Sequence, residues 1–165
     1  MKQKYWIILI CLVAGLFVFT SLAMSKRQQE QMSEISRKMD EMNIRFTLDG
    51  VADGGLQIKP MDMCSIFANA LDNAIEAASS CKEPFISFAI KRTDKFFVIK
   101  ITNSAEKKID IGKLLSTSGY TSKSDKEHHG FGLMNVRRSV EDYNGILKAE
   151  SDEKSFTLSI LMPRA

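Results

Sequence analysis

The sequence is poor in the residues that most often carry metal or nucleophilic chemistry. Its 165 residues include two histidines, and its three cysteines, Cys11, Cys64 and Cys81, have neither paired nor metal-binding spacing. We expect reduced structural thiols, as is usual in a cytosolic domain. A net charge of +3 and the lack of a basic patch with interleaved aromatic residues argue against a nucleic-acid partner.

The N-terminal segment departs from the otherwise ordinary globular composition. Tyr5 to Met24 carries no charge over about 20 residues, enough for a helix to cross the roughly 30 Å core of a bilayer. We predict that residues 1–25 form one transmembrane anchor helix. A cleaved signal peptide is the alternative, because Ser21-Leu22-Ala23 resembles a cleavage site.

Residues 26–43 are polar and rich in helix-forming residues. Met32, Ile35, Met39 and Met42 recur at helical spacing and predict an amphipathic linker helix with a short apolar seam. Such a seam suits pairing with a second copy, as a homodimer, or with another protein's helix. It suits equally well packing on the helix's own domain, and the sequence leaves these alternatives open.

Residues 44–165 read as one domain of alternating helices and strands. Apolar alternation marks the strands, and glycine with asparagine marks the turns. We therefore predict an α+β sandwich with helices over one face of a mixed, mostly antiparallel sheet. The expected elements are a helix after Pro60, strands over 85–92 and 96–102, a functional loop over 104–130, a helix over 133–143, and strands over 146–151 and 155–162.

The helix after Pro60 is apolar except for one polar stripe. That stripe contains Asn69, Asp72, Asn73 and Glu76. Mg²⁺ prefers oxygen ligands, and an amide also donates hydrogen bonds to phosphate oxygens. Asn69 and Asn73, one turn apart, could thus serve a metal ion and a phosphate from one helix face. The structural alternative is that the two amides cap a neighbouring loop.

Two further features suit a ligand. Asn103 follows an apolar strand, where a polar side chain can read a ligand edge or simply form a turn. Gly130 and Gly132 precede a helix, whose free N–H groups attract anions when glycines let the backbone approach. A plain loop-to-helix turn is the alternative there.

Taken in order, three segments resemble a known family. "NALDNAIEA", "IKITNS" and "GYTSKSDKEHHGFGLMNVRRSVEDYNG" resemble the N-box, the adenine-contacting strand end and the glycine-rich ATP lid of the GHKL superfamily. Over about residues 44–163 the chain is most similar to the catalytic domain of peptide-pheromone (quorum-sensing) sensor histidine kinases. This resemblance implies the Bergerat fold, with ATP and Mg²⁺ held beneath a mobile lid.

The resemblance also implies roles for individual residues. Asn69 matches the Mg²⁺ ligand and Asn73 a phosphate contact, with Asp72 and Glu76 as supporting N-box residues. Asn103 lies where many relatives place an adenine-reading aspartate, although the DxGxG pattern around that position is absent.

The lid segment matches the family as well. Gly130, Gly132 and Leu133 match the glycine box, and Lys123 matches a phosphate partner.

The implied function is an ATP-binding histidine kinase domain that lacks its own acceptor. Ser65 stands where the family's ATP hydrolases carry a general-base glutamate, which disfavours hydrolysis as the main activity. His128 and His129 precede the lid glycines and match the lid rather than a phosphoacceptor. We therefore expect transfer of the γ-phosphate to a histidine on a partner in two-component signalling.

Two other functions remain open from the sequence, a nucleotide-binding pseudokinase that regulates a partner kinase and an anti-sigma-type serine kinase. The expected location is the cell membrane, with a single pass and the catalytic domain in the cytoplasm, where ATP is available. Lysine and arginine flank both ends of the apolar run, so the charges do not decide the orientation.

Overall fold

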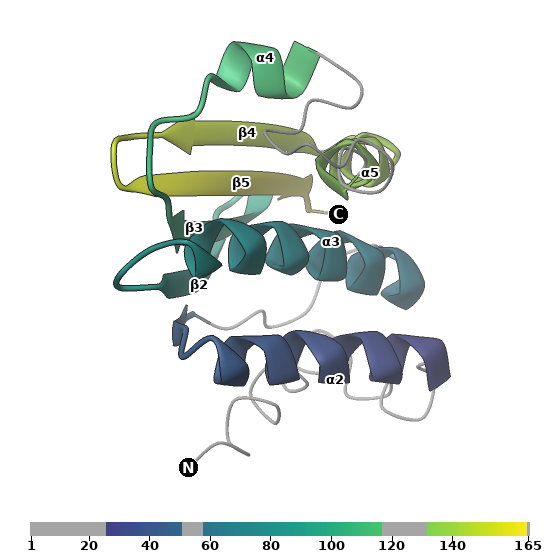
Figure 1. Cartoon of the computed structure of the whole chain (residues 1–165). Coiled ribbons are helices and arrows are strands. Elements are labelled where there is room, and N and C mark those ends of the chain that lie inside the picture. The colour runs from purple at the N-terminus through teal and green to yellow at the C-terminus, as the bar shows by residue number, and fades with distance from the viewer. Residues whose placement is uncertain (1–25, 51–57, 117–131, 165) are drawn as a thin grey trace.

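The computed structural model describes residues 26–50, 58–116 and 132–164 (Figure 1). The predicted anchor over residues 1–25 lies outside these ranges. None of the helices within the described ranges is long and apolar enough to cross a membrane.

Five strands form a single mixed sheet in the order β1-β2-β3-β5-β4. The β1–β2 pair is parallel and the other three pairs are antiparallel, which confirms the predicted mixed, mostly antiparallel sheet. Strand β1 was not expected from the sequence, because five residues with two apolar positions give a weak periodic signal. The strands are β1 (Arg45–Asp49), β2 (Phe85–Arg92), β3 (Phe96–Ser104), β4 (Ile146–Ser151) and β5 (Ser155–Pro163).

The helices α2, α3 and α5 share one core with the sheet. Helix α3 lies over the strands, α2 runs alongside α3, and α5 lies beside the ends of β4 and β5 (Figure 1). Alternate residues of the strands, such as Ile86 and Phe88 in β2, are buried toward these helices. The rings of Phe67 in α3 and Phe88 meet edge to face at 5.3 Å. The helices are α2 (Lys26–Glu41), α3 (Pro60–Ser79), α4 (Ile111–Ser116) and α5 (Gly132–Glu141).

The predicted loop over residues 104–130 was partly wrong. Residues 111–116 form helix α4, which contacts β4. Six residues are too few for a helical pattern to repeat, and Gly112 weakens the local helix signal, so this helix was not predicted. The remainder of that stretch from residue 117 to 130 lies outside the described residues.

Helix α2 packs on its own domain. Ile35 and Met39 are 1% and 7% exposed and belong to the same core cluster as α3. Met42, the last seam residue, is 42% exposed, and the side chain of Met32 lies outside the described part. The structure therefore favours the alternative in which the seam packs on its own domain. Two of the four seam residues, Ile35 and Met39, are buried there and are not available to a homodimer contact.

Replacing Ile35 with alanine should therefore destabilise the isolated chain. We expect a loss of roughly 2–5 kcal/mol in the free energy of unfolding, because a buried aliphatic side chain is removed from a packed core. Denaturant unfolding measures it. The matched control is Met42→Ala, directly after the same helix, which should change stability by less than about 0.5 kcal/mol. Equal, small losses in both variants would show that α2 does not pack on α3.

Candidate nucleotide-binding site

Helix α3 carries the polar stripe and is held by its buried face. Pro60 occupies the first turn, where its missing N–H costs no hydrogen bond, and Asp62 also lies in the first turn. Phe67 and Leu71 are at most 1% exposed, so the apolar face fixes the rotation of the helix. The stripe residues remain partly exposed and are thereby presented at the margin of the core.

Asn69 has its side-chain amide oriented by its own helix. The Nδ2 atom donates to the main-chain oxygen of Ser65 at 2.8 Å and lies 3.4 Å from the Ser65 hydroxyl oxygen. The amide nitrogen is thus engaged within the helix, which leaves the amide oxygen as the atom to offer a ligand. An oxygen in this position suits a hard cation.

Asn73 lies one turn further along α3 and meets the start of α5. Its Nδ2 atom is buried and has no hydrogen-bond partner. A Cβ atom added at Gly132 would lie 3.2 Å from both Nδ2 and Oδ1 of Asn73, so glycine makes room for this amide. Leaving a buried donor unpaired costs about 1–3 kcal/mol. A ligand with an acceptor oxygen would satisfy this donor. Leu133, next to Gly132, packs against the core.

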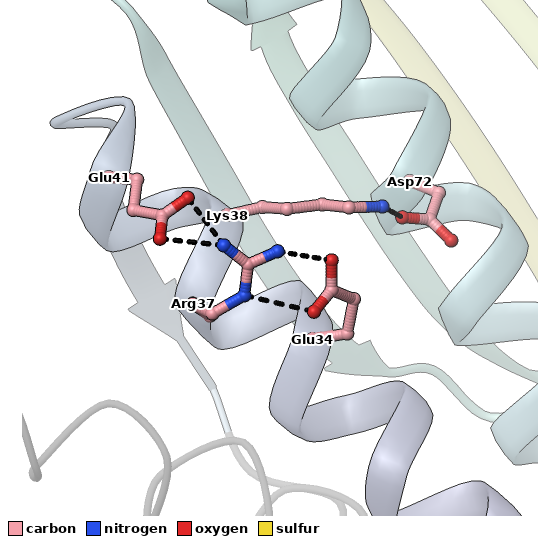
Figure 2. A network of polar contacts seen from close by, with 5 residues as sticks. All are labelled: Glu34, Arg37, Lys38, Glu41 and Asp72. Carbon is pink, nitrogen blue, oxygen red and sulfur yellow. Dashed lines mark hydrogen bonds and ion pairs between the residues drawn. The ribbon is translucent and has the colours of Figure 1, made fainter.

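Asp72 and Glu76 lie differently from the two asparagines. Asp72 turns toward α2, where its Oδ1 lies 3.1 Å from Nζ of Lys38 (Figure 2). This pair joins the stripe helix to α2, whereas Arg37 of α2 pairs within its own helix with Glu34 and Glu41 (Figure 2). Glu76 is half-buried, and its main-chain oxygen accepts a hydrogen bond from Ser79.

Asn103 lies near the end of β3 and is 2% exposed. Its Nδ2 atom donates to the main-chain oxygen of Ser104 at 2.9 Å. With the nitrogen engaged, the amide oxygen remains as an acceptor, which is the atom that an adenine amino group requires. The orientation of this amide therefore fits the role that the family resemblance implies.

Tyr143 fixes the far end of α5 to α3. Its hydroxyl donates to Asp62 Oδ2 and accepts from the main-chain N–H of Lys59. Burial, and then the Asp62 carboxylate, raise the pKa of this hydroxyl above its usual value. Because Gly132 meets Asn73 at the other end, α5 is positioned against α3 at both of its ends. The sequence held no local signal for this contact, since 81 residues separate its partners.

The other predicted site residues could not be placed. Lys123 and Gly130 lie outside the described residues, as do His128 and His129. In the ranges that the structure describes, no cluster of three His, Cys, Asp or Glu side chains could hold a metal ion. A Mg²⁺ ion here would depend on Asn69 together with phosphate and water oxygens, which is a usual arrangement for this ion.

Solved structures share this fold. The catalytic domain of the histidine kinase ThkA, in a nucleotide-free form, superposes with a TM-score of 0.68 at 20% identity, covering 83% of this chain and 90% of that one. The mycobacterial sensor histidine kinase MprB gives 0.65 at 15% identity, covering 83% and 93%. Acinetobacter baumannii AdeS, also a histidine kinase, gives 0.59 at 11% identity, covering 82% and 62%.

The fold is therefore that of a histidine kinase catalytic domain. No curated protein sequence matches the chain. Residues 58–163 match the GHKL domain family, so the chain belongs to that family and the predicted resemblance is confirmed.

We predict that Tyr143→Phe lowers the free energy of unfolding by about 1–3 kcal/mol, because a hydrogen bond to a charged group is lost. The pKa of Tyr143 is raised in the folded state, so its contribution is complete below the unfolded value near 10 and is lost as pH rises through the folded value. The difference between wild type and variant should thus be constant from about pH 7 to 9 and shrink above about pH 10.

Denaturant unfolding across this pH range measures both effects. Asp62→Asn is the companion variant, because it keeps an acceptor for the hydroxyl and should cost less than Tyr143→Phe. A difference between wild type and Tyr143→Phe that stays constant up to pH 12 would contradict the account.

Proposed function

We propose that this chain is a membrane-tethered ATP-binding domain of sensor histidine kinase type, which transfers the γ-phosphate of ATP to a histidine on a partner. The observation that carries the proposal is the buried, unpartnered Asn73 amide against Gly132, with the Asn69 oxygen one turn away. The Asn73 nitrogen lacks a hydrogen-bond acceptor, which a phosphate oxygen would supply. The Asn69 oxygen is free to bind a cation.

Each residue has one task in this proposal. Asn69 supplies an oxygen to Mg²⁺, which when bound neutralises charge on the phosphates. Asn73 donates its free N–H to a phosphate oxygen, and Gly132 lets the backbone of α5 approach the same group. Asn103 accepts from the adenine amino group. Asp72 supports the site indirectly by tying α3 to Lys38 of α2.

Transfer in trans follows from the position of the histidines. His128 and His129 adjoin the lid glycine Gly130 in the sequence. A lid residue acting as acceptor would have to turn inward while its own backbone covers the nucleotide. An acceptor must lie in line with the γ-phosphate, and positioning supplies most of the catalysis. A partner's histidine meets this requirement more simply.

A pseudokinase is the second candidate. It is favoured by the missing DxGxG pattern at Asn103, whereas Ser65 at the glutamate position argues only against hydrolysis and fits both candidates. In that case nucleotide binding would change only the affinity for a partner kinase. Radiolabelled ATP mixed with the chain and candidate kinase hairpins distinguishes the two candidates, because acid-labile label on the partner requires transfer and its absence requires a silent domain.

The binding site itself is tested by titrating the chain with ADP in the presence and absence of Mg²⁺. Asn69→Ala should weaken the Mg²⁺-dependent part of binding by about 1–3 kcal/mol, or roughly 5-fold to 150-fold. Calorimetry measures this. Gln31→Ala, which removes an exposed amide from α2, is the control and should bind as wild type does. No binding by wild type, or the same Mg²⁺ dependence in Asn69→Ala, would refute the assignment.

Gly132→Ala tests the fit between α5 and Asn73. The added methyl group should displace the Asn73 amide and weaken ADP binding, whereas the helix gains up to about 1 kcal/mol of intrinsic preference over glycine. Affinity should therefore fall without loss of thermal stability. Gly112→Ala is the matched control, since an added Cβ there would meet only the Asp110 carboxylate. Unchanged ADP affinity in Gly132→Ala would place the nucleotide elsewhere.

A further inference from the structure

Several chain segments meet at the end of the domain where α3 begins. Tyr143, after α5, contacts Lys59 and Asp62 at the start of α3. A Cβ added at Gly145 would lie 2.9 Å from the main-chain oxygen of Leu161, so β4 begins where β5 ends. The start of α3, the end of α5 and one end of the sheet therefore share this side of the molecule.

The β2–β3 turn lies at the same end. The main-chain N–H of Arg164 donates to Lys95 at 2.9 Å, and its guanidinium donates to the main-chain oxygen of Thr93 at 3.0 Å. Because Arg164 directly follows β5, the turn and the end of β5 are adjacent.

Helix α2 also begins at this end. The main-chain N–H of Arg45, after α2, donates to the main-chain oxygen of Pro84, after α3, at 3.0 Å. Both helices therefore end at the same end of the sheet, opposite to the one just described. The Lys38–Asp72 pair keeps the two helices side by side. They therefore run in the same direction, with both N-termini at the end just described (Figure 1).

The surface of this end combines apolar and cationic side chains. Met61 and Ile146 are 65% and 45% exposed, two of the three large apolar side chains exposed in the described ranges. The same end exposes the cations Lys59, Lys91 and Lys95, and its exposed acids include Asp94, Glu141 and Asp142. We call this surface the basal face and define it by Lys59, Met61, Lys91, Lys95 and Ile146.

The opposite end of the domain is acidic by comparison. It carries Met42, the third exposed apolar side chain. Its exposed acids, which slightly outnumber its exposed cations Arg45, Lys82, Lys107, Lys108 and Lys154, are Glu83, Glu106, Asp110, Glu150, Asp152 and Glu153. Charge is therefore distributed unequally along the direction of α2 and α3.

We propose that the basal face docks on the anionic lipid headgroups of the membrane that holds the N-terminal segment, an inference that rests on the tether proposed above. Helix α2 begins at Lys26, directly beyond the uncharged run that ends at Met24, so the chain reaches the domain at this face. Lysines at the same end as exposed apolar side chains suit an anionic bilayer surface. The lysines attract the anionic headgroups, and the apolar side chains enter the boundary between the headgroups and the acyl chains. Tethering makes the encounter intramolecular, so weak contacts suffice.

Docking in this direction also leaves the nucleotide end accessible. Asn103 lies near the end of β3 that is remote from the β2–β3 turn. The basal face therefore fixes the orientation of the domain and turns the Asn103 end toward the solution, where ATP and a partner's histidine would approach.

The test uses the full chain reconstituted into phosphatidylcholine vesicles with and without phosphatidylserine. An amine-acylating reagent followed by mass spectrometry reports the reactivity of each lysine. With phosphatidylserine, Lys59, Lys91 and Lys95 should react several-fold more slowly, and high salt should restore their reactivity. The internal controls Lys82, Lys107 and Lys154, exposed at the opposite end, should react alike in both vesicles.

Two variants separate docking from a general lipid effect. Met61→Gln with Ile146→Gln should reduce the protection of the basal lysines, whereas Met42→Gln should not change it. Vesicle flotation reports the tether independently. A chain that floats but whose lysines all react equally in both vesicles overturns the docking alone, and a chain that does not float overturns the tether and the docking together.

Discussion

The structure depends on helix α3, which packs in the core through one face and carries the polar stripe on another. Its apolar face, with Phe67 and Leu71, packs in the core that the helix shares with the sheet, while its polar stripe lies at the margin of the same core. A polar group at such a boundary is costly unless it finds a partner. Asn69 and Asp72 find partners within the protein, and Asn73 does not. The unmet donor of Asn73 is the reason we propose this helix as a ligand-binding element.

The surroundings of α3 hold that stripe in place from three sides. The sheet fixes its rotation, Lys38 of α2 pairs with Asp72, and α5 is placed by Tyr143 at one end and by Gly132 at the other. This arrangement links the chain that arrives from the N-terminus to the residues that would hold a nucleotide. A change in the position of α2 would reach Asn73 through one ion pair and one helix, because Asp72 and Asn73 are neighbours.

The sequence predicted the α+β class, the mixed sheet and four of its strands, because long alternating segments such as Phe85–Arg92 carry a strong period of two. It missed β1 and α4, which are too short to repeat a pattern. The polar stripe could be identified from the sequence, but the contacts of its individual residues could not. Those contacts depend on Lys38 and Gly132, which are distant along the chain. For the same reason the sequence did not determine whether Ile35 and Met39 pack on their own domain or on a partner.

We propose that the unpaired Asn73 amide binds a phosphate oxygen of the nucleotide. The most direct measurement is the ¹⁵N–¹H signal of the Asn73 side-chain amide, assigned by its loss in Asn73→Ala, during titration with ADP and Mg²⁺. The account predicts a large shift and slower hydrogen exchange of this NH₂ group on binding, as expected when a buried donor gains an acceptor. An unchanged Asn73 signal at saturating nucleotide would contradict it.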